Sequence, residues 1–237
     1  MAAITHAVED YLKVIWKLSH RRHEGDRVPV GDIAAALSVS APSVTGMVQK
    51  LQGMGLVRYA RYGGVRLSTK GRKIALEIVR HHRLWELYLH TRLGVPLDRV
   101  DLEAERLEHV LSDDMEELLA RALGDPTHDP HGDPIPTKAG VLGIVRGEPL
   151  PALPPGATAV VTHVSDRQAD KLRYLVTLGL VPGARLVLVD RAPFGGPITI
   201  RIGRKRCAID QDLGALVRVV EEPPSRRRPR RERRRAG

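Results

Sequence analysis

The sequence predicts a mainly helical protein that ends in a small all-β domain. In residues 6–22, 69–94 and 100–124, apolar residues recur every three or four positions, which is the spacing of amphipathic helices. From residue 157 the pattern changes to short alternating stretches separated by Gly and Pro, which is typical of a small β-barrel. The chain has 237 residues, enough for two or three small domains.

The first 75 residues predict a helix followed by a helix–turn–helix. Residues 6–22 place apolar side chains on one face, and a short helix then leads into a turn at residues 39–41. The second helix of the pair starts at about Pro42, because proline's missing N–H costs nothing in a first turn, and Ser40 is placed to cap it.

A basic hairpin follows these helices. Residues 57–68 contain β-forming residues around Gly63 and Gly64, a pair typical of tight hairpin turns. Helix, helix–turn–helix and hairpin in this order predict a winged helix, which binds DNA by placing the start of its second helix in the major groove. Nearby lysines and arginines then contact phosphates. The predicted DNA contacts are Ser40, Ala41, Pro42, Ser43, Thr45, Gly46, Gln49, Lys50, Arg58, Arg61 and Arg66.

The charge of the chain is divided into blocks of opposite sign. Residues 1–75 contain 12 Lys or Arg and 5 Asp or Glu, whereas residues 76–140 contain 7 and 14. A basic block beside an acidic one indicates two partners of opposite charge, such as phosphate for the first and a cation for the second.

The acidic block carries a cluster of potential metal ligands. Residues 69–94 form one long predicted helix, and residues 100–124 contain at least one more. Glu105, Glu108 and His109 are three and four positions apart, which places them on one helix face. Carboxylates buried there would repel one another, whereas a divalent cation takes carboxylate and imidazole as ligands. Further candidates are Asp101 one turn earlier, His82 and Glu86 one turn apart on the long helix, and Asp10 on the first helix.

A Pro-rich linker and an Arg-rich tail complete the domain organisation. Residues 223–237 contain eight Arg and one Glu, and the tail is too polar to form a core, so it is predicted to be disordered. The predicted domains are 1–75 (winged helix), 76–140 (helical), 141–156 (linker), 157–221 (small β domain) and 222–237 (tail).

The sequence also indicates where the protein works. One cysteine, Cys207, excludes an internal disulfide framework and fits a reducing compartment. The N-terminus carries charges too early for a signal peptide, and no apolar run approaches the length of a membrane span. We therefore expect a cytoplasmic protein without a membrane partner.

A winged helix preceded by EDYL is followed by HHRLWELYL, EAERLEHVLSD and DPHGDPIP, and then by a Pro-rich linker and a β-barrel. This order of motifs resembles the diphtheria toxin repressor family of metal-dependent transcriptional regulators, and the resemblance covers about residues 4–220. It implies that the helical domain is a dimerisation domain and that the C-terminal β-barrel is SH3-like, of the FeoA type. It also implies a homodimer that binds a palindromic operator when activated by divalent metal and represses metal-uptake genes.

The resemblance further implies a ligand set. Asp10, Glu105, Glu108 and His109 fall on the primary metal site, and His82, Glu86 and Asp101 fall on a second site. Asp10 and Glu105 stand where the iron-responsive branch has Met and Cys, which is similar to the manganese-responsive branch. Oxygen and nitrogen donors alone suit Mn²⁺ or Fe²⁺.

Two positions depart from the family pattern. Lys13 stands where the manganese branch has a ligand glutamate of a two-metal cluster. In the C-terminal domain, Gln168 and Lys171 stand where the iron branch has Glu and Gln, and Gln168 and Asp170 are the candidate donors there.

Two other functions remain open from the residues. One is a winged-helix regulator that does not respond to metal, in which the acidic helix is a solvated face. The other is a di-iron metalloenzyme, but such centres take Glu-x-x-His pairs from two helices, and this chain has Glu105-x-x-x-His109 once. We favour the metal-activated repressor, which is not an enzyme.

Overall fold

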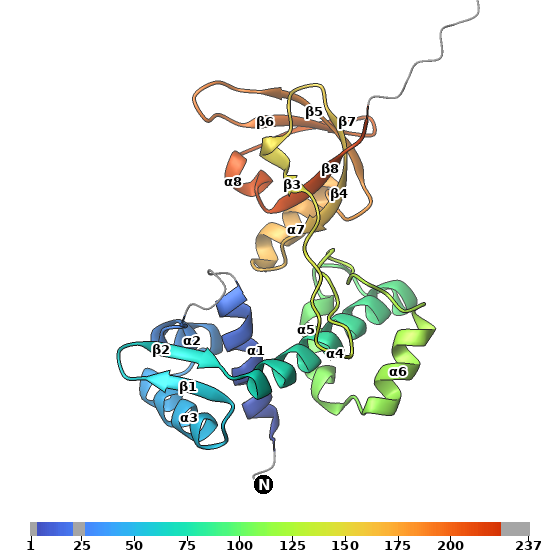
Figure 1. Cartoon of the computed structure of the whole chain (residues 1–237). Helices are drawn as coiled ribbons and strands as arrows, with labels where there is room; N and C mark the ends of the chain where they lie inside the picture. Colours follow the sequence, from blue (N-terminus) through green and yellow to red (C-terminus); the bar gives the residue numbers. More distant parts are fainter. Residues whose placement is uncertain (1–3, 21–26, 224–237) are drawn as a thin grey trace, which may run out of the picture. The chain divides into compact units, whose positions relative to one another are not determined.

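The computed structural model describes residues 4–20 and 27–223, and the chain divides into two compact units, residues 1–144 and 145–237 (Figure 1). Almost all of the basic tail predicted for residues 222–237 lies outside the described residues. Among the residues that the structure describes, no helix is both long enough and apolar enough to span a bilayer.

The first unit begins with the predicted winged helix. Val8, Leu12 and Ile15 of the first helix are fully buried in one core with Val44 and Val48 of the third. The two strands pair antiparallel to form the predicted hairpin. These elements are α1 (His6–His20), α2 (Val30–Leu37), α3 (Ala41–Gly53), β1 (Val57–Ala60) and β2 (Gly64–Leu67).

The rest of the first unit is helical and is built around one long helix. It consists of α4 (Thr69–Leu93), α5 (Val100–Leu107), the 3₁₀ turn η1 (Glu108–Val110) and α6 (Asp113–Ala122). In α4, Ala75 and Val79 are buried in the winged-helix core. Further along α4, Leu84 packs with residues of α6 and Leu89 packs with residues of α5. The single helix α4 therefore belongs to both halves of the unit.

The helical region predicted for residues 100–124 is interrupted in the structure. Leu111 has an extended backbone (φ −79°, ψ 114°), and Ser112 starts α6 by accepting a hydrogen bond from the N–H of Met115 at 3.3 Å. Glu108 and His109 therefore lie in the tighter η1 turn rather than in a continuing α-helix. This turn places the Glu108 side chain inside the protein, where it is 0% exposed.

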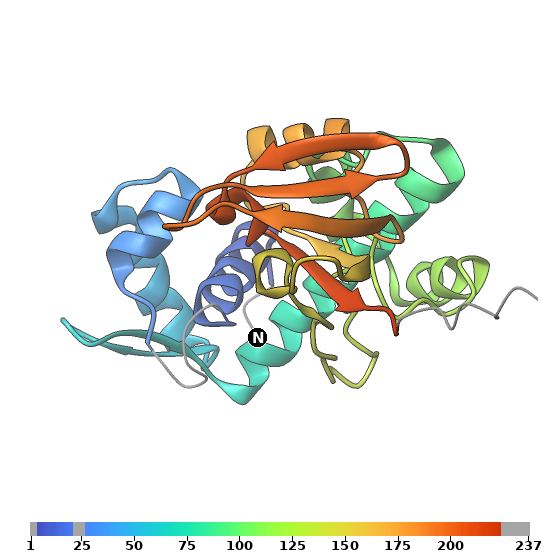
Figure 2. The same ribbon diagram turned by 90° about the horizontal axis from the view of Figure 1, so that it is seen from above.

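The second unit is a six-stranded antiparallel sheet with short helices (Figure 2). The strand order is β3-β8-β4-β5-β6-β7, so the sheet is open at β3 and β7 and is not the closed barrel expected from the sequence. Helix α7, which the strand pattern did not predict, packs Leu172 and Leu175 on the core of the sheet. The elements are β3 (Glu148–Pro149), η2 (Leu150–Ala152), β4 (Thr158–Val164), α7 (Ala169–Leu178), β5 (Arg185–Arg191), β6 (Ile198–Ile202), β7 (Lys205–Ile209), α8 (Gln211–Gly214) and β8 (Val217–Glu221).

Candidate metal centre and DNA-contact surface

The first turn of α3 exposes the residues predicted to contact bases. Ser40 caps the helix, because its Oγ accepts a hydrogen bond from the N–H of Ser43 at 3.3 Å. Thr45 is half-buried and donates from Oγ1 to the carbonyl of Ala41 at 3.0 Å. Small side chains such as these contact thymine methyls and discriminate weakly between bases. The exposed residues of this face are Ser40, Ala41, Pro42, Ser43, Gly46, Gln49 and Lys50.

The hairpin contributes the cationic part of the same surface. Arg58, Arg61 and Arg66 are exposed, as phosphate contacts require. A groove between α3 and the hairpin is lined by Thr45, Arg61 and the turn residue Tyr62, among others. The Arg61 guanidinium lies over the Tyr62 ring, 5.4 Å from its centroid, which holds the arginine at the hairpin tip.

Three of the four predicted primary ligands meet between α1 and η1. Nε2 of His109 lies 2.8 Å from Oδ1 of Asp10 and 3.4 Å from Oε1 of Glu108. Ligand atoms of these three residues, which we term the α1 triad, all lie within 4.8 Å of one another. The other ring nitrogen, Nδ1 of His109, donates to Oε2 of Glu9 at 2.7 Å and thereby orients the ring. The α1 triad thus joins the first helix of the winged helix to the turn after α5.

The fourth predicted primary ligand, Glu105, belongs to a second triad. Nδ1 of His82 lies 2.5 Å from Oε2 of Glu108 and 3.7 Å from Oε2 of Glu105. These three residues, the α4 triad, also offer ligand atoms within 4.8 Å of one another. Nζ of Lys13 enters this triad, since it donates to Oε2 of Glu105 at 2.7 Å and to Oε1 of Glu108. Glu108 is therefore shared by both triads and by the ammonium group.

Burial and charge oppose each other in this cluster. Burial lowers the pKa of Lys13, but the carboxylates of Glu108 and Glu105 outweigh it and raise the pKa overall. Burial also lowers the pKa of His82, but Glu86 and the other carboxylates around it raise this pKa well above its usual value. Burial raises the pKa of Glu108, whereas the hydrogen bond from His82 and the charge of Lys13 lower it overall. The cluster is therefore held by buried ion pairs.

The predicted second site is also assembled. Nε2 of His82 lies 3.2 Å from Oδ1 of Asp101 and 3.5 Å from Oε1 of Glu86, and the ligand atoms of all three residues lie within 4.8 Å of one another. The hydrogen bond from His82 lowers the pKa of Asp101. His82 thus faces both the α4 triad and this second group.

His131 joins the second group, although the sequence did not place it among the ligands. Its Nδ1 lies 3.5 Å from Oε1 of Glu86, and both atoms are buried without a hydrogen-bond partner. Nε2 of His131 donates to the carbonyl of Leu97 at 3.0 Å, so in the neutral ring Nδ1 carries the lone pair. Asp129 shapes the loop, because its Oδ1 accepts the N–H groups of His131 and Asp133, each at 2.9 Å. An unprotonated ring nitrogen facing a carboxylate oxygen is an arrangement that a cation would stabilise.

The donor set of these groups fits Mn²⁺ or Fe²⁺. The side chains offer carboxylate oxygens and imidazole nitrogens, and none of them is a thiolate. The two buried atoms of Glu86 and His131 that have no hydrogen-bond partner would gain a contact from a bound cation. The residues present are therefore compatible with a divalent metal.

The two candidate donors of the C-terminal domain lie in the second unit, at the start of α7. Gln168 is the residue before the helix, and its side chain makes no capping hydrogen bond. Asp170 is exposed and pairs with Nη1 of Arg173 at 3.3 Å. Neither belongs to the ligand clusters within the first unit, so their assignment stays a prediction.

Sequence reasoning also left Glu9 and Lys13 without a role. Glu9 holds the ring of His109, and Lys13 is 2% exposed although it is a lysine. The available signal for Lys13 was its position on the apolar face of α1, directly after Leu12 and three residues before Trp16. A charge on a buried face requires a partner of opposite charge.

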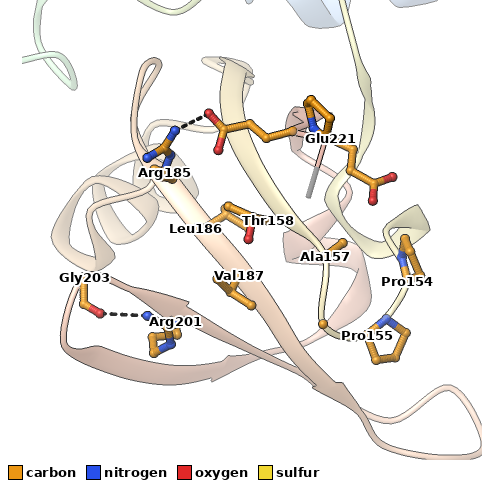
Figure 3. A pocket seen from close by; sticks show the side chains of 13 residues that line it. Pro154, Pro155, Ala157, Thr158, Arg185, Leu186, Val187, Arg201, Gly203 and Glu221 are labelled. Carbon is orange, nitrogen blue, oxygen red and sulfur yellow. Dashed lines mark hydrogen bonds and ion pairs between the residues drawn. The ribbon is translucent and has the colours of Figure 1, made fainter. Parts of the chain in front are cut away.

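A groove in the second unit carries none of the clusters described above (Figure 3). It is lined by Pro154, Pro155 and residues of β4, β5 and β6. Nη2 of Arg185 donates to Oε1 of Glu222 at 2.6 Å, and Nη1 of Arg201 donates to the carbonyl of Gly203 at 3.3 Å. Both contacts are exposed to solvent, where such interactions contribute little to stability.

Three family models match successive parts of the chain. Residues 3–65 match the iron dependent repressor N-terminal DNA binding domain, and residues 68–137 match the iron dependent repressor metal binding and dimerisation domain. Residues 148–221 match the FeoA domain. The matched ranges cover the winged helix, the helices with the ligand clusters and the open sheet.

Similar proteins agree with these matches over nearly the whole chain. The iron-dependent repressor IdeR of Mycobacterium leprae is 34% identical over 232 residues, covering 92% of this chain and 99% of that protein. The diphtheria toxin repressor of Corynebacterium diphtheriae is 29% identical over 231 residues, covering 93% and 100%. A solved structure of a manganese-dependent transcriptional repressor in complex with manganese has a TM-score of 0.78 and 35% identity, covering 91% of this chain and 100% of that one. Together with the winged helix and the ligand clusters, these matches show that the chain belongs to the diphtheria toxin repressor family of metal-dependent transcriptional regulators.

Proposed function

We propose that one divalent ion, Mn²⁺ or Fe²⁺, held by the α1 triad switches this repressor into its operator-binding form. The observation that carries the proposal is the 2.8 Å approach of Asp10 on α1 to His109 on η1. A bound ion would supply two positive charges to donors on both halves of the first unit. The protein itself orients these donors, since Glu9 fixes the His109 ring and the η1 turn holds Glu108 inside.

A second ion site is proposed at His82, Glu86 and Asp101, with His131 as a further donor. Its support is the pair of buried atoms on Glu86 and His131 that have no hydrogen-bond partner. Glu105, which the sequence placed in the primary site, is proposed instead to act through Lys13, because its carboxylate is 2.7 Å from that ammonium group.

The chain is further proposed to act as a homodimer on a palindromic operator. Four large apolar side chains of α5, η1 and α6 are exposed within the region that matches a dimerisation domain. Burying them between two copies would place two α3 helices on half-sites about one helical turn or a small multiple apart. Such a protein acts on the chromosome, in the cytoplasm, and we expect repression of metal-uptake genes and no enzymatic activity. The exposed residues are Leu102, Val110, Met115 and Leu118.

Metal-dependent binding to DNA tests the proposal. A duplex selected from a random library with protein and Mn²⁺ serves as the operator, and fluorescence anisotropy measures its affinity. Removing the metal with a chelator is expected to weaken binding at least about tenfold, because coupling between linked sites is typically about 1–3 kcal/mol. Equal affinity with and without chelator would favour the regulator that does not respond to metal.

A matched pair of variants tests the site. Glu108→Gln removes a carboxylate shared by both triads and is expected to abolish the response to metal. Glu103→Gln changes an exposed carboxylate on the neighbouring α5 and is expected to respond like the wild type. An unchanged Mn²⁺ response in Glu108→Gln would show that the α1 triad is not the activating site.

A further inference from the structure

The two triads that share Glu108 define two adjacent positions for a cation. The α1 triad surrounds one position with Asp10, Glu108 and His109, and the α4 triad surrounds the other with His82, Glu105 and Glu108. In each triad the three ligand atoms lie close enough together to contact one ion. By donor geometry alone, the cluster could hold two ions bridged by Glu108, as in two-metal sites whose ions are about 3.5–4 Å apart.

A protein side chain already supplies a positive charge at one of the two positions. Lys13 comes from α1, is 2% exposed, and donates to Glu105 at 2.7 Å and to Glu108. Its ammonium group thus engages two of the three donors of the α4 triad. An ammonium ion has no lone pair, so it cannot become a ligand, and its charge repels a second cation.

We propose that Lys13 is a built-in cation that takes the place of a second metal ion, so that the cluster accepts one divalent ion, at the α1 triad. Removing the lysine charge opens the position at the α4 triad to a second ion. The inference rests on the proposed function, because it requires that the α1 triad binds metal.

A purely structural role for Lys13 makes a different prediction. A buried ion pair also stabilises or orients its partners, and removing one member leaves an uncompensated charge. In that case a neutral residue at position 13 would lower stability without changing the number of ions in the cluster. The number of ions therefore distinguishes the two roles.

The test compares full-length wild type with Lys13→Gln and Lys13→Met. Met retains much of the lysine stem, so it provides a second variant if Gln does not fold. Lys17→Gln removes the same charge one turn along α1 and is the matched control. Crystals grown with Mn²⁺ locate each ion by anomalous diffraction, and electron paramagnetic resonance in solution detects magnetic coupling between neighbouring Mn²⁺ ions.

The expected wild-type result is one Mn²⁺ at the α1 triad, with Nζ of Lys13 still in contact with Glu105. The Lys13 variants are expected to hold a further ion at the α4 triad, magnetically coupled to the one at the α1 triad, and Lys17→Gln is expected to match the wild type. An ion at the α4 triad of the wild type, or none there in a folded Lys13 variant, would overturn the inference and leave the proposed function intact, whether or not the separate group at His82, Glu86 and Asp101 is occupied. A wild type without Mn²⁺ at the α1 triad would overturn the proposed function itself.

Discussion

Glu108 and Glu116 are both fully buried carboxylates, and each has basic side chains as partners. Glu108 contacts Lys13 and His82 inside the ligand cluster. Glu116, on α6, accepts hydrogen bonds from Nε of Arg80 at 2.5 Å and from Nζ of Lys138 at 3.1 Å. Arginine and lysine remain charged at any physiological pH, so Glu116 has permanent partners and holds α6 against α4.

Glu116 makes the stability of the first unit depend on pH. Burial raises the pKa of Glu116, but the hydrogen bonds from Arg80 and Lys138 outweigh it and lower the pKa overall. A lowered folded-state pKa stabilises the protein above the unfolded value of 4.5, and this contribution is lost as the pH falls through the folded value. Glu116→Gln is therefore expected to lower the free energy of unfolding by about 1–3 kcal/mol at pH 7 and by less near pH 4.

Urea unfolding at both pH values measures this difference. Glu117→Gln changes a neighbouring carboxylate that is 61% exposed and is the control, for which we expect little change at either pH. If Glu116→Gln lowered the free energy of unfolding equally at pH 7 and pH 4, the ionised carboxylate would not be the source of the stability.

At the scale of single elements, the start of α4 is fixed by a close approach of two backbones. Ser68 caps the helix by accepting a hydrogen bond from the N–H of Gly71 at 3.0 Å, and it donates to the carbonyl of Gly55 at 2.8 Å. A Cβ atom on Gly71 would lie 2.0 Å from the backbone oxygen of Leu56. Only glycine allows α4 to lie this close to the chain after α3.

Gly71→Ala is therefore expected to separate α4 from the winged helix. Such overpacking typically lowers the free energy of unfolding by about 1–3 kcal/mol, and chemical denaturation measures it. Gly31→Ala, in α2, is the control, because a Cβ there meets no atom within 4 Å and is expected to be neutral or slightly stabilising. Equal stability of the two variants would mean that the Leu56 segment moves away at little cost.

The elements that the sequence predicted best are those with strong periodicity and clear caps. The apolar face of α1 and the Ser40 cap of α3 were predicted and are present, and α4 ends at Leu93, within one residue of the expected end. The break at Ser112 was missed, because the apolar pattern continues across it while the cap ends the helix. The two-residue strand β3 was missed because so short a segment has no periodicity to detect.

Among the candidate ligands, too, local spacing predicted some contacts and missed others. Asp10 and His109 are 99 positions apart, and the resemblance to a family rather than their spacing brought them together. His82 and Glu86 are one helical turn apart, and their spacing alone placed them on one face. Lys13 and His131 depend on contacts between α1, α4, η1 and a loop, which no local pattern contains.

At the scale of the whole molecule, each unit has a hydrophobic core of its own. The proposed α1 triad and the second group lie within the first unit, whereas Gln168 and Asp170 lie in the second. Mn²⁺ at about 100 times its dissociation constant stabilises the folded form that binds it by about 2.7 kcal/mol. We expect calorimetry to show a higher melting temperature for the first unit only.

Trp fluorescence distinguishes the two unfolding transitions, because Trp16 and Trp85 both belong to the first unit. The calorimetric transition that coincides with the change in fluorescence is therefore that of the first unit. In the control variant Glu108→Gln, the same Mn²⁺ concentration is expected to leave the melting temperature of the first unit unchanged. If metal raised the melting temperatures of both units, the second unit would contribute ligands, and Gln168 and Asp170 would be the first candidates.

The long helix α4 has a mechanical consequence for the operator. Its 25 residues span about 37 Å as one uninterrupted rod, with one end in the winged-helix core and the other among the helices of the proposed dimer interface. One additional base pair between half-sites would require the α3 helix of one copy to move by about 3.4 Å and to turn by about 35° relative to that of the other copy. A continuous α-helix resists such bending or twisting, because its own hydrogen bonds would have to break. In the proposed dimer we therefore expect the length of α4 to fix the preferred spacing of the half-sites, independently of the bases that they contain.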